Sequence, residues 1–174
     1  MFKKQLTADE YISMVLERLK EKKYHIKNNV VYDNQTFMCV ANRTAFERER
    51  LGSFFNTVFL FARFDKPDLQ ILKDFSRKSY KYAKKKYRNL YLPPILFWGL
   101  KCFPVAIVDS LDKEADDTIR FKEPKRHFGS FEKLVVFDLR IQTLIYYQLF
   151  NTWSILVDEL DRKVIREMLS PNFI

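Results

Sequence analysis

The first apolar residues of the chain recur at helical intervals behind a polar start. Thr7 is followed three residues later by Glu10, which is the spacing of a capping box. The next apolar positions, mostly three or four residues apart, are Ile12, Val15, Leu16 and Leu19. Residues with this spacing share one side of a helix, so the pattern predicts a helix over residues 8–22.

Alternation of polar and apolar residues replaces this pattern in "YHIKNNVVYDNQTFMCVA", residues 24–41. Asp33, Asn34 and Gln35 form a turn signal within it, so the segment predicts two strands joined in a hairpin. The segment "FFNTVFLFARF", residues 54–64, is apolar at both alternating sets of positions in its middle. Such a strand lies in the centre of a sheet and is covered on both faces.

A second helix is predicted from "DKPD", residues 65–68, to about residue 88, because Asp caps helices and Pro67 fits a first turn. The apolar run "ILFWGLKCFPVAIV", residues 95–108, predicts a further strand. Within it, Gly99 and Pro104 indicate a bulge, a bend or an edge position. Residues 109–121 then predict a short acidic helix.

The last third of the chain predicts two strands and a closing helix. The segment "LVVFDLRIQTLIYY", residues 134–147, has its turn between Asp138 and Gln142. An amphipathic helix follows, with apolar positions at Trp153, Leu156, Leu160, Val164 and Met168. The complete order is α-β-β-β-α-β-α-β-β-α. This order predicts an α+β fold with a mixed, mostly antiparallel sheet of five or six strands packed against helices.

Composition favours a single domain over residues 1–174. The chain has 174 residues, of which 47% are hydrophobic, and only 3 glycines and 6 prolines, so flexible linkers are not expected. Cys39 and Cys102 lie in apolar runs and are expected as buried thiols in a reducing compartment. The amino terminus lacks a signal-peptide pattern, and prolines with Lys101 interrupt the most apolar stretch, residues 90–108. We therefore expect a cytoplasmic protein without a membrane span.

The first six elements resemble, in their order, the core of the PD-(D/E)XK nucleases, over about the first 108 residues. In that family, an acid on the second strand and a Glu-x-Lys-like pair on the third hold a divalent metal beside the attacked phosphate. Here the second strand is "TFMCVA" and the third is "FFNTVFLFARF", and neither carries a carboxylate. Because the required acids are missing from the expected positions, we reject the nuclease chemistry. The order of elements alone does not imply function.

Other familiar chemistries also lack their residues. The three glycines lie too far apart for a phosphate-binding loop, and two histidines without a close cysteine pair exclude a structural zinc site. The acids between Asp109 and Asp117 lack the pattern of a calcium loop and predict a solvated helix instead. We predict no cofactor, no metal and no assigned catalytic residue.

A loop in "EPKRHFGSFE", residues 123–132, offers one candidate ligand site. Lys125, Arg126 and His127 lie together there, and histidine is a suitable acid–base group near neutral pH. The cluster could bind a phosphorylated or carboxylated molecule, or His127 could act as a base with Cys102 or Ser130 as its partner. The alternative is a partly exposed histidine at the start of a strand.

The second predicted helix carries the most distinctive pattern. Residues 76–88, "SRKSYKYAKKKYR", contain five lysines, two arginines and three tyrosines but no acid. At 100° per residue one side of this helix is apolar, and the opposite side groups six cations: Arg77, Lys78, Lys81, Lys84, Lys85 and Arg88. Tyr80 and Tyr87 fall at the border between the two sides. Such a surface suits phosphate contacts with aromatic stacking, although a solvated face is the simpler alternative.

The formal net charge of +9 favours an anionic partner. We therefore predict a non-catalytic binding or assembly module whose basic helix, about residues 67–88, contacts nucleic acid, or else an acidic protein or membrane surface. The alternative function is a small-molecule enzyme with its site around Arg126 and His127. The closing helix could also form a homo-oligomer contact, although its apolar positions are more typical of a core.

Overall fold

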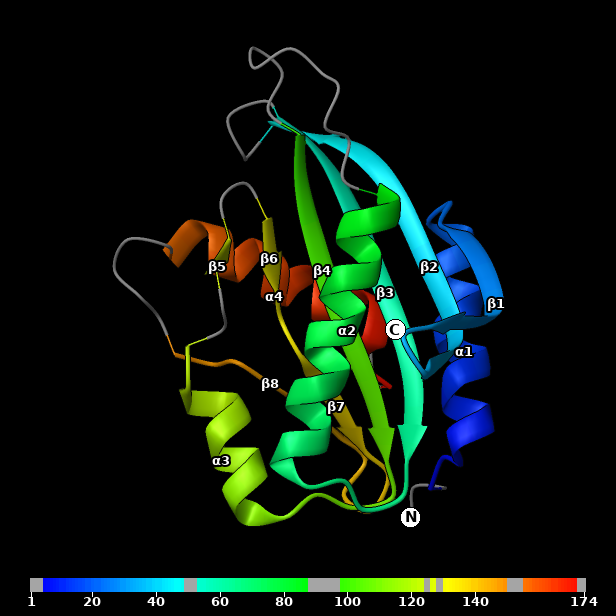
Figure 1. The fold of residues 1–174 in the computed structure, drawn as a ribbon, viewed down its shortest axis with the longest axis vertical. Coiled ribbons are helices and arrows are strands. Elements are labelled where there is room, and N and C mark those ends of the chain that lie inside the picture. The colour runs from blue at the N-terminus through cyan, green and yellow to red at the C-terminus, as the bar shows by residue number, and fades with distance from the viewer. Residues whose placement is uncertain are drawn as a thin grey trace.

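The computed structural model describes residues 5–48, 53–87, 98–123, 126–127, 130–149 and 155–171; for residues 98, 126, 127 and 155–157 it describes only the backbone. Figure 1 shows the arrangement of the helices and strands. In chain order they are α1 (Ala8–Glu21), β1 (His25–Tyr32), β2 (Gln35–Glu47), β3 (Ser53–Phe64), α2 (Leu69–Tyr87), β4 (Trp98–Val108), α3 (Lys113–Phe121), β5 (Arg126–His127), β6 (Ser130–Glu132), β7 (Val135–Asp138), β8 (Thr143–Tyr146) and α4 (Ile155–Leu169).

All the strands belong to one mixed sheet, which confirms the predicted α+β class. The order begins β1-β2-β3-β4, and the far edge of β4 is shared by β6 and β7. β3 and β4 run parallel, whereas the β1–β2, β2–β3, β5–β6 and β7–β8 pairs are antiparallel. In the described part of the chain the sheet has eight strands rather than five or six, because β5 and β6, two and three residues long, were expected as loop.

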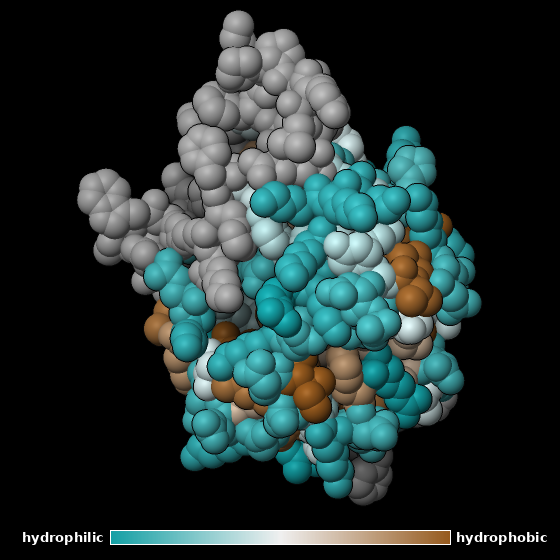
Figure 2. All heavy atoms as spheres, viewed as in Figure 1, coloured by the Kyte–Doolittle hydropathy of each residue, from teal (hydrophilic) through white to brown (hydrophobic). Residues whose placement is uncertain are grey.

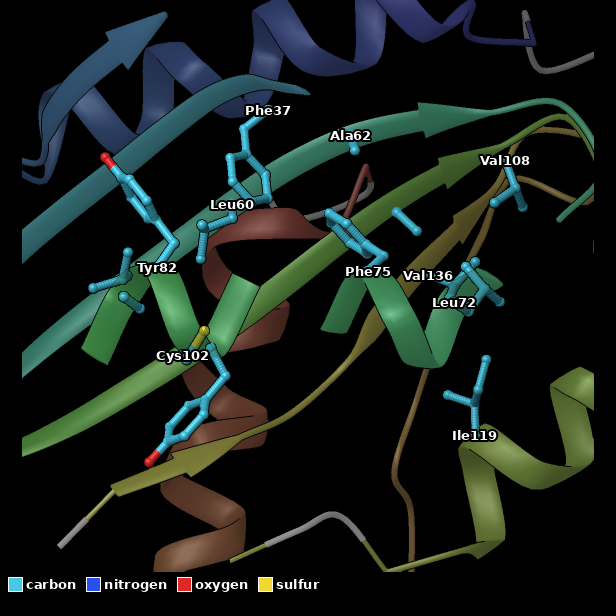
Figure 3. Packing of buried hydrophobic residues seen from close by; sticks show 14 of the residues in the cluster. Phe37, Leu60, Ala62, Leu72, Phe75, Tyr82, Cys102, Val108, Ile119 and Val136 are labelled. Atoms are coloured by element: carbon cyan, nitrogen blue, oxygen red, sulfur yellow. The ribbon is translucent and has the colours of Figure 1, made fainter. Parts of the chain in front are cut away.

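Two apolar layers cover the two faces of this sheet. On one face, Leu72 and Phe75 of α2 and Ile119 of α3 pack over the sheet (Figure 3). On the other, Tyr11 of α1 and Ile165 of α4 lie against it. β3 serves both layers, since Val58, Leu60 and Ala62 face α2 while Phe59 and Phe61 face α1 and α4. The prediction of a central strand covered on both faces is confirmed.

Pro104 lies inside β4 rather than at an edge. The backbone N–H groups of Lys133 and Leu139 donate to the carbonyls of Cys102 and Val108, at 2.9 Å each. The even-numbered residues of β4 therefore direct their backbone groups away from β3. The N–H that proline lacks would point at the place where β6 ends and β7 begins, so its loss leaves the pairing with β3 intact.

The predicted cap of α1 is confirmed, whereas the predicted cap of α2 is wrong. In α1, Thr7 and Glu10 form the predicted capping box. α2 begins at Leu69, later than expected, because Asp68 and not Asp65 is its cap: the Asp68 carboxylate accepts a hydrogen bond of 2.7 Å from the Ile71 N–H. Proline therefore precedes the cap instead of occupying the first turn.

Segments from the two ends of the described chain lie side by side. Leu6 N–H donates to the Gln142 side chain at 3.0 Å, and the Gln5 amide donates to the Leu139 carbonyl at 2.8 Å. The Tyr11 hydroxyl donates to the Leu169 carbonyl at 2.9 Å. These contacts fix α1 against the β7–β8 turn and the end of α4. No helix among the described residues is long and apolar enough to cross a membrane.

Candidate functional sites

The basic face of α2, as far as the structure describes it, consists of Arg77, Lys78, Lys81, Lys84 and Lys85. Its opposite side is buried through Leu72, Phe75, Ser79, Tyr82 and Ala83, as the angular pattern predicted. Arg77, Lys81, Lys84 and Lys85 are exposed, and Lys78 is half-buried. The surface over the upper part of α2 is largely hydrophilic in Figure 2, whereas hydrophobic residues reach the surface lower down. Arg88 lies outside the described residues.

Two cations of this face are already paired within the helix. The Asp74 carboxylate binds the Arg77 guanidinium, and it lies 3.0 Å from the Lys78 ammonium. These hydrogen bonds hold the pKa of the Asp74 carboxyl below its usual range. Arg77 and Lys78 are therefore partly neutralised, and the last turns of α2 carry the uncompensated charge.

The second half of the helix has no such compensation. In the described part of the structure, Lys81, Lys84, Lys85 and Lys86 form no ion pair, and the exposed fourth lysine, Lys86, extends the basic face. The Lys85 ammonium lies 5.7 Å from the centre of the Tyr32 ring on the neighbouring β1. Lys86 is exposed at the last turn of α2.

The tyrosines contribute less to this surface than the sequence indicated. Tyr80 is only 7% exposed, and its hydroxyl lies 2.6 Å from the Ser130 hydroxyl oxygen. Tyr87 is half-buried and meets Tyr82 edge to face, with ring centres 6.1 Å apart. The prediction that Tyr80 lies at the border of the helix is thus wrong, because this ring packs between α2 and β6. Aromatic stacking on a ligand is left to partly exposed Tyr32 and Tyr87.

The end of α2 is fixed to the sheet rather than projecting from it. The Asn56 side-chain amide on β3 donates to the Tyr87 carbonyl at 2.6 Å. Burial raises the pKa of the Tyr87 phenol, so this residue stays neutral at physiological pH. The helix backbone that carries the lysines of the last turns is therefore fixed to the sheet before any partner binds.

The second predicted cluster is only partly described. Lys125 lies outside the described residues, and for Arg126 and His127 the structure gives the backbone, which forms β5 and pairs with Phe131 and Ser130 of β6. β5 flanks β6, so the predicted loop is a short hairpin at the sheet edge. That Lys125, Arg126 and His127 bind a ligand together stays a prediction.

A cavity of about 200 Å³ lies beside β6, between α2 and α3. Its apolar walls include Leu69, Ile119, Leu134 and Tyr147. Its polar lining includes Lys73, Ser76, Thr118, Lys122, Glu123 and Glu132. The Ser76 hydroxyl donates to the Glu132 carboxylate at 3.4 Å. Apolar walls with a few polar groups are typical of small-molecule sites.

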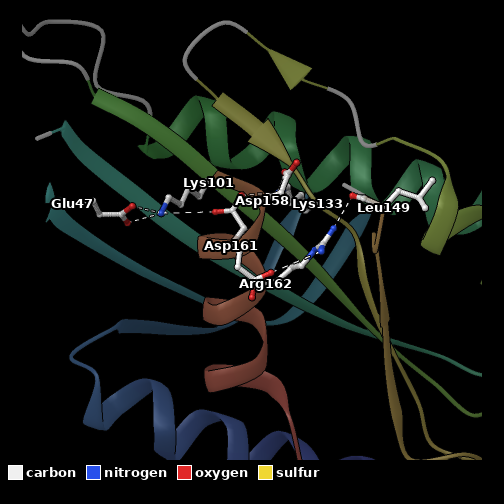
Figure 4. A network of polar contacts seen from close by, with 8 residues as sticks. Glu47, Lys101, Lys133, Leu149, Asp158, Asp161 and Arg162 are labelled. Atoms are coloured by element: carbon white, nitrogen blue, oxygen red, sulfur yellow. Dashed lines mark hydrogen bonds and ion pairs between the residues drawn. The ribbon is translucent and has the colours of Figure 1, made fainter. Parts of the chain in front are cut away.

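A buried ionic network lies on the opposite face of the sheet (Figure 4). The Lys101 ammonium binds both carboxylate oxygens of Glu47 and lies 4.0 Å from Asp161. The Lys133 ammonium donates to Asp158 at 2.6 Å and to Asp161 at 2.7 Å. Lys101 and Asp161 are 1% and 0% exposed. Buried charges require partners of this kind, and the network joins β2, β4 and the end of β6 to α4.

Sequence reasoning missed this network, although one signal was present. Lys101 interrupts an apolar strand that is covered on both faces, and a buried lysine needs an acid. Its partner Glu47 ends β2, which runs six residues beyond the predicted "TFMCVA". That carboxylate is bound to lysine, and the described residues contain no group of three His, Cys, Asp or Glu side chains that could hold a metal ion.

The cysteines are free and buried, as predicted. Burial raises the pKa of the Cys39 thiol to about 12 and raises that of Cys102 well above its usual value. Thiols are nucleophilic only as thiolates, so the proposed role of Cys102 as a partner of His127 is not supported by its environment.

The closing helix points part of its predicted apolar face inward. Met168 is buried, and Val164 packs against the layer of α1 and α4. Trp153 lies outside the described residues, and the side chain of Leu156 is not described. The predicted homo-oligomer contact through this helix stays a prediction.

Comparisons with models of known protein families, with curated proteins and with solved structures found no match.

Proposed function

We propose that this protein is a binding module whose basic α2 face contacts the phosphates of a nucleic acid. The observation that carries the proposal is the exposed set Lys81, Lys84, Lys85 and Lys86, which has no acidic partner among the described residues. Three and four residues along a helix correspond to a rise of about 4.5–6 Å. The ammonium groups can thus address successive positions of an extended polyanion, and the fixed end of α2 lowers the cost of ordering them.

Because the tyrosines of α2 are largely buried, we expect contacts with the phosphate backbone of the nucleic acid rather than recognition of its bases. Tyr80 is held by Ser130, so it is not a stacking platform. Phosphate contacts carry no sequence information directly. We therefore expect binding with little sequence preference and a strong dependence on salt.

A labelled single-stranded oligonucleotide, titrated by fluorescence anisotropy at several salt concentrations, tests this function. Each phosphate contact on a single strand contributes about −0.7 to the slope of log affinity against log salt. The variant Lys81→Glu/Lys84→Glu/Lys85→Glu should therefore lose affinity and flatten the slope by about 2. These side chains are exposed, so circular dichroism should show an unchanged fold.

The matched control is Lys20→Glu/Lys113→Glu/Lys163→Glu, which changes the net charge equally through exposed residues of α1, α3 and α4. It should retain most of the salt slope. No binding at low salt, or equal losses in the two triple variants, would show that α2 is only a solvated helix.

The cavity beside β6 favours a second function, the binding of a small phosphorylated or carboxylated molecule near Arg126 and His127. Exposed Lys73 and Lys122 line the cavity together with apolar walls. This lining suits a ligand that has an anionic end and an apolar body. Titration of the protein with benzoate as a probe, followed by the shifts of backbone amides in NMR spectra, tests this second function. Ile119→Trp should fill the cavity and abolish shifts of its lining residues, whereas Ile71→Trp, at an exposed position, should not.

A further inference from the structure

A second hollow lies where α1 ends and β1 begins, beside the end of β2. Its volume is about 400 Å³, and its lining consists of Lys22, Lys23, His25, Asn42, Arg43, Thr44 and Ala45. His25 and Asn42 are direct neighbours across the β1–β2 pair. Residues from the helix end and from two strands therefore meet in one concave surface.

Arg43 is held in place before any ligand arrives. Its guanidinium carbon lies 4.9 Å from the centre of the Tyr24 ring, and Nη1 donates to the Lys22 carbonyl at 3.0 Å. Tyr24 is itself buried against Phe59, with ring centres 5.6 Å apart. Among the described residues Nη2 makes no hydrogen bond. A planar guanidinium fixed in this way is suited to a tetrahedral oxyanion.

The charged side chains that line the hollow, those of Lys22, Lys23 and Arg43, are all basic. None of the described lining residues is acidic. Glu47, four residues beyond Arg43 on the same strand, is bound by Lys101. Carbonyls at the end of α1, which would repel an anion, already accept hydrogen bonds: Arg18, Leu19 and Lys20 accept from backbone N–H groups, and Lys22 accepts from Arg43.

We propose that this hollow binds a phosphate group, with Arg43 as its fixed anchor and Lys22, Lys23 and His25 around it. Asn42 and Thr44 add polar side chains to the lining. Arg43 and Tyr24 lie on the side of the sheet covered by α1 and α4, whereas the Thr44 hydroxyl donates to the Asn56 side chain, which holds the end of α2 on the other side. The proposal rests on Arg43 and its neighbours and not on the lysines of α2, so it does not depend on the proposed function. The phosphate belongs either to a small phosphorylated molecule or to a nucleic-acid backbone.

Titration of the protein with inorganic phosphate, followed by ¹H–¹⁵N NMR, tests the site directly. Saturable shifts should centre on the amides of residues 22–25 and 42–44. Lys22→Gln/Lys23→Gln removes two exposed cations and should weaken phosphate binding about tenfold or more, since hydrogen bonds to charged groups are strong. Arg43→Lys keeps the charge but loses the planar fork, and it should also weaken binding.

The control Lys20→Gln/Lys27→Gln removes two exposed lysines that flank the hollow without lining it. It should bind phosphate as the unaltered protein does. Equal weakening in both double variants, or no saturable shift in the hollow, would overturn the proposal. The Lys22/Lys23 variant alters only exposed side chains, so its failure to bind cannot be ascribed to misfolding when its spectrum is otherwise unchanged.

The oligonucleotide titration described above identifies the source of the phosphate. If the hollow binds a nucleic-acid backbone, adding Lys22→Gln/Lys23→Gln to the α2 charge reversal should flatten the slope of log affinity against log salt further. If it takes a small phosphorylated molecule, oligonucleotide binding should be unchanged while phosphate binding is lost.

Discussion

The carboxylate of Asp161 holds two lysines inside the molecule. It accepts from Lys133 at 2.7 Å and lies 4.0 Å from the ammonium of Lys101, while no part of Asp161 is exposed. Removing water from three charges has a large free-energy cost, which their mutual attraction offsets only when every partner is present. The network therefore fixes the orientation of α4 across β4. It stabilises the protein only while all of its charged partners are present.

We expect Asp161→Asn to lower the free energy of unfolding by about 1.5–3 kcal/mol, since it removes the charged acceptor that the two buried lysines share, while Glu47 and Asp158 still bind one lysine each. Urea denaturation at neutral pH measures this loss. The control is Glu159→Gln on the same helix, an exposed acid paired with Arg166. Exposed pairs contribute up to about 1 kcal/mol, so a similar loss in both variants would contradict a special role for Asp161.

Tyr24 gives the stability an alkaline limit. Burial, the largest cause, raises the pKa of its phenol to about 12, whereas an unfolded chain releases this proton near pH 10. Between these values the folded protein retains a proton that the unfolded chain has lost. The contribution is therefore fully present below about pH 10 and is lost as the pH rises toward 12.

In urea titrations between about pH 9 and 12, we expect Tyr24→Phe to lose stability less steeply than the unaltered protein, by up to about 1.4 kcal/mol per pH unit. Tyr11, whose pKa burial also raises, acts in both proteins and cancels in the comparison. Parallel curves would show that Tyr24 ionises equally in the folded and unfolded states.

At the scale of single elements, the helices follow local rules that the sequence displays. The capping box of α1 uses neighbours three residues apart, and the apolar side of α2 follows from its angular period. The exposed lysines of α2 were therefore predictable. The burial of Tyr80 was not, because it depends on Ser130, fifty positions away. The ionic network was missed for the same reason, since Glu47, Lys101 and Asp161 are distant in sequence.

Thr7→Ala should lower the free energy of unfolding by about 1 kcal/mol, because it removes the side-chain acceptor of the α1 capping box. Thr7→Ser keeps the hydroxyl and serves as the matched control. Chemical denaturation of both variants measures the difference. Equal stability of the two would show that the N-terminus of α1 is held only by its tertiary contacts.

At the scale of the whole molecule, β3 and β4 form the centre from which the two layers extend. Their parallel register runs from Phe54–Trp98 to Phe64–Val108, and both strands contribute to both apolar layers. At the sheet edge, by contrast, β1 carries exposed side chains such as those of Lys27 and Val31. Local opening should therefore begin at β1, where fewer buried side chains oppose it.

Hydrogen exchange followed by mass spectrometry should show this gradient. We expect peptides from β3 and β4 to exchange only through global unfolding, while peptides from β1 exchange earlier. Addition of urea below the unfolding midpoint should leave the β3–β4 rates unchanged at first. Equal protection of β1 and β3 would indicate that the sheet opens as one unit.

The hydrogen bond between Tyr11 and Leu169 has a consequence for synthesis on the ribosome. α1 is translated well before the residues against which Tyr11 packs, including Phe137 at 3.7 Å between ring centres. Domains fold as their chain appears, and unpaired apolar surface favours aggregation. The apolar side of α1 must therefore be shielded by a chaperone or by transient contacts until translation passes residue 169, so α1 is among the last of the described helices to reach its native packing.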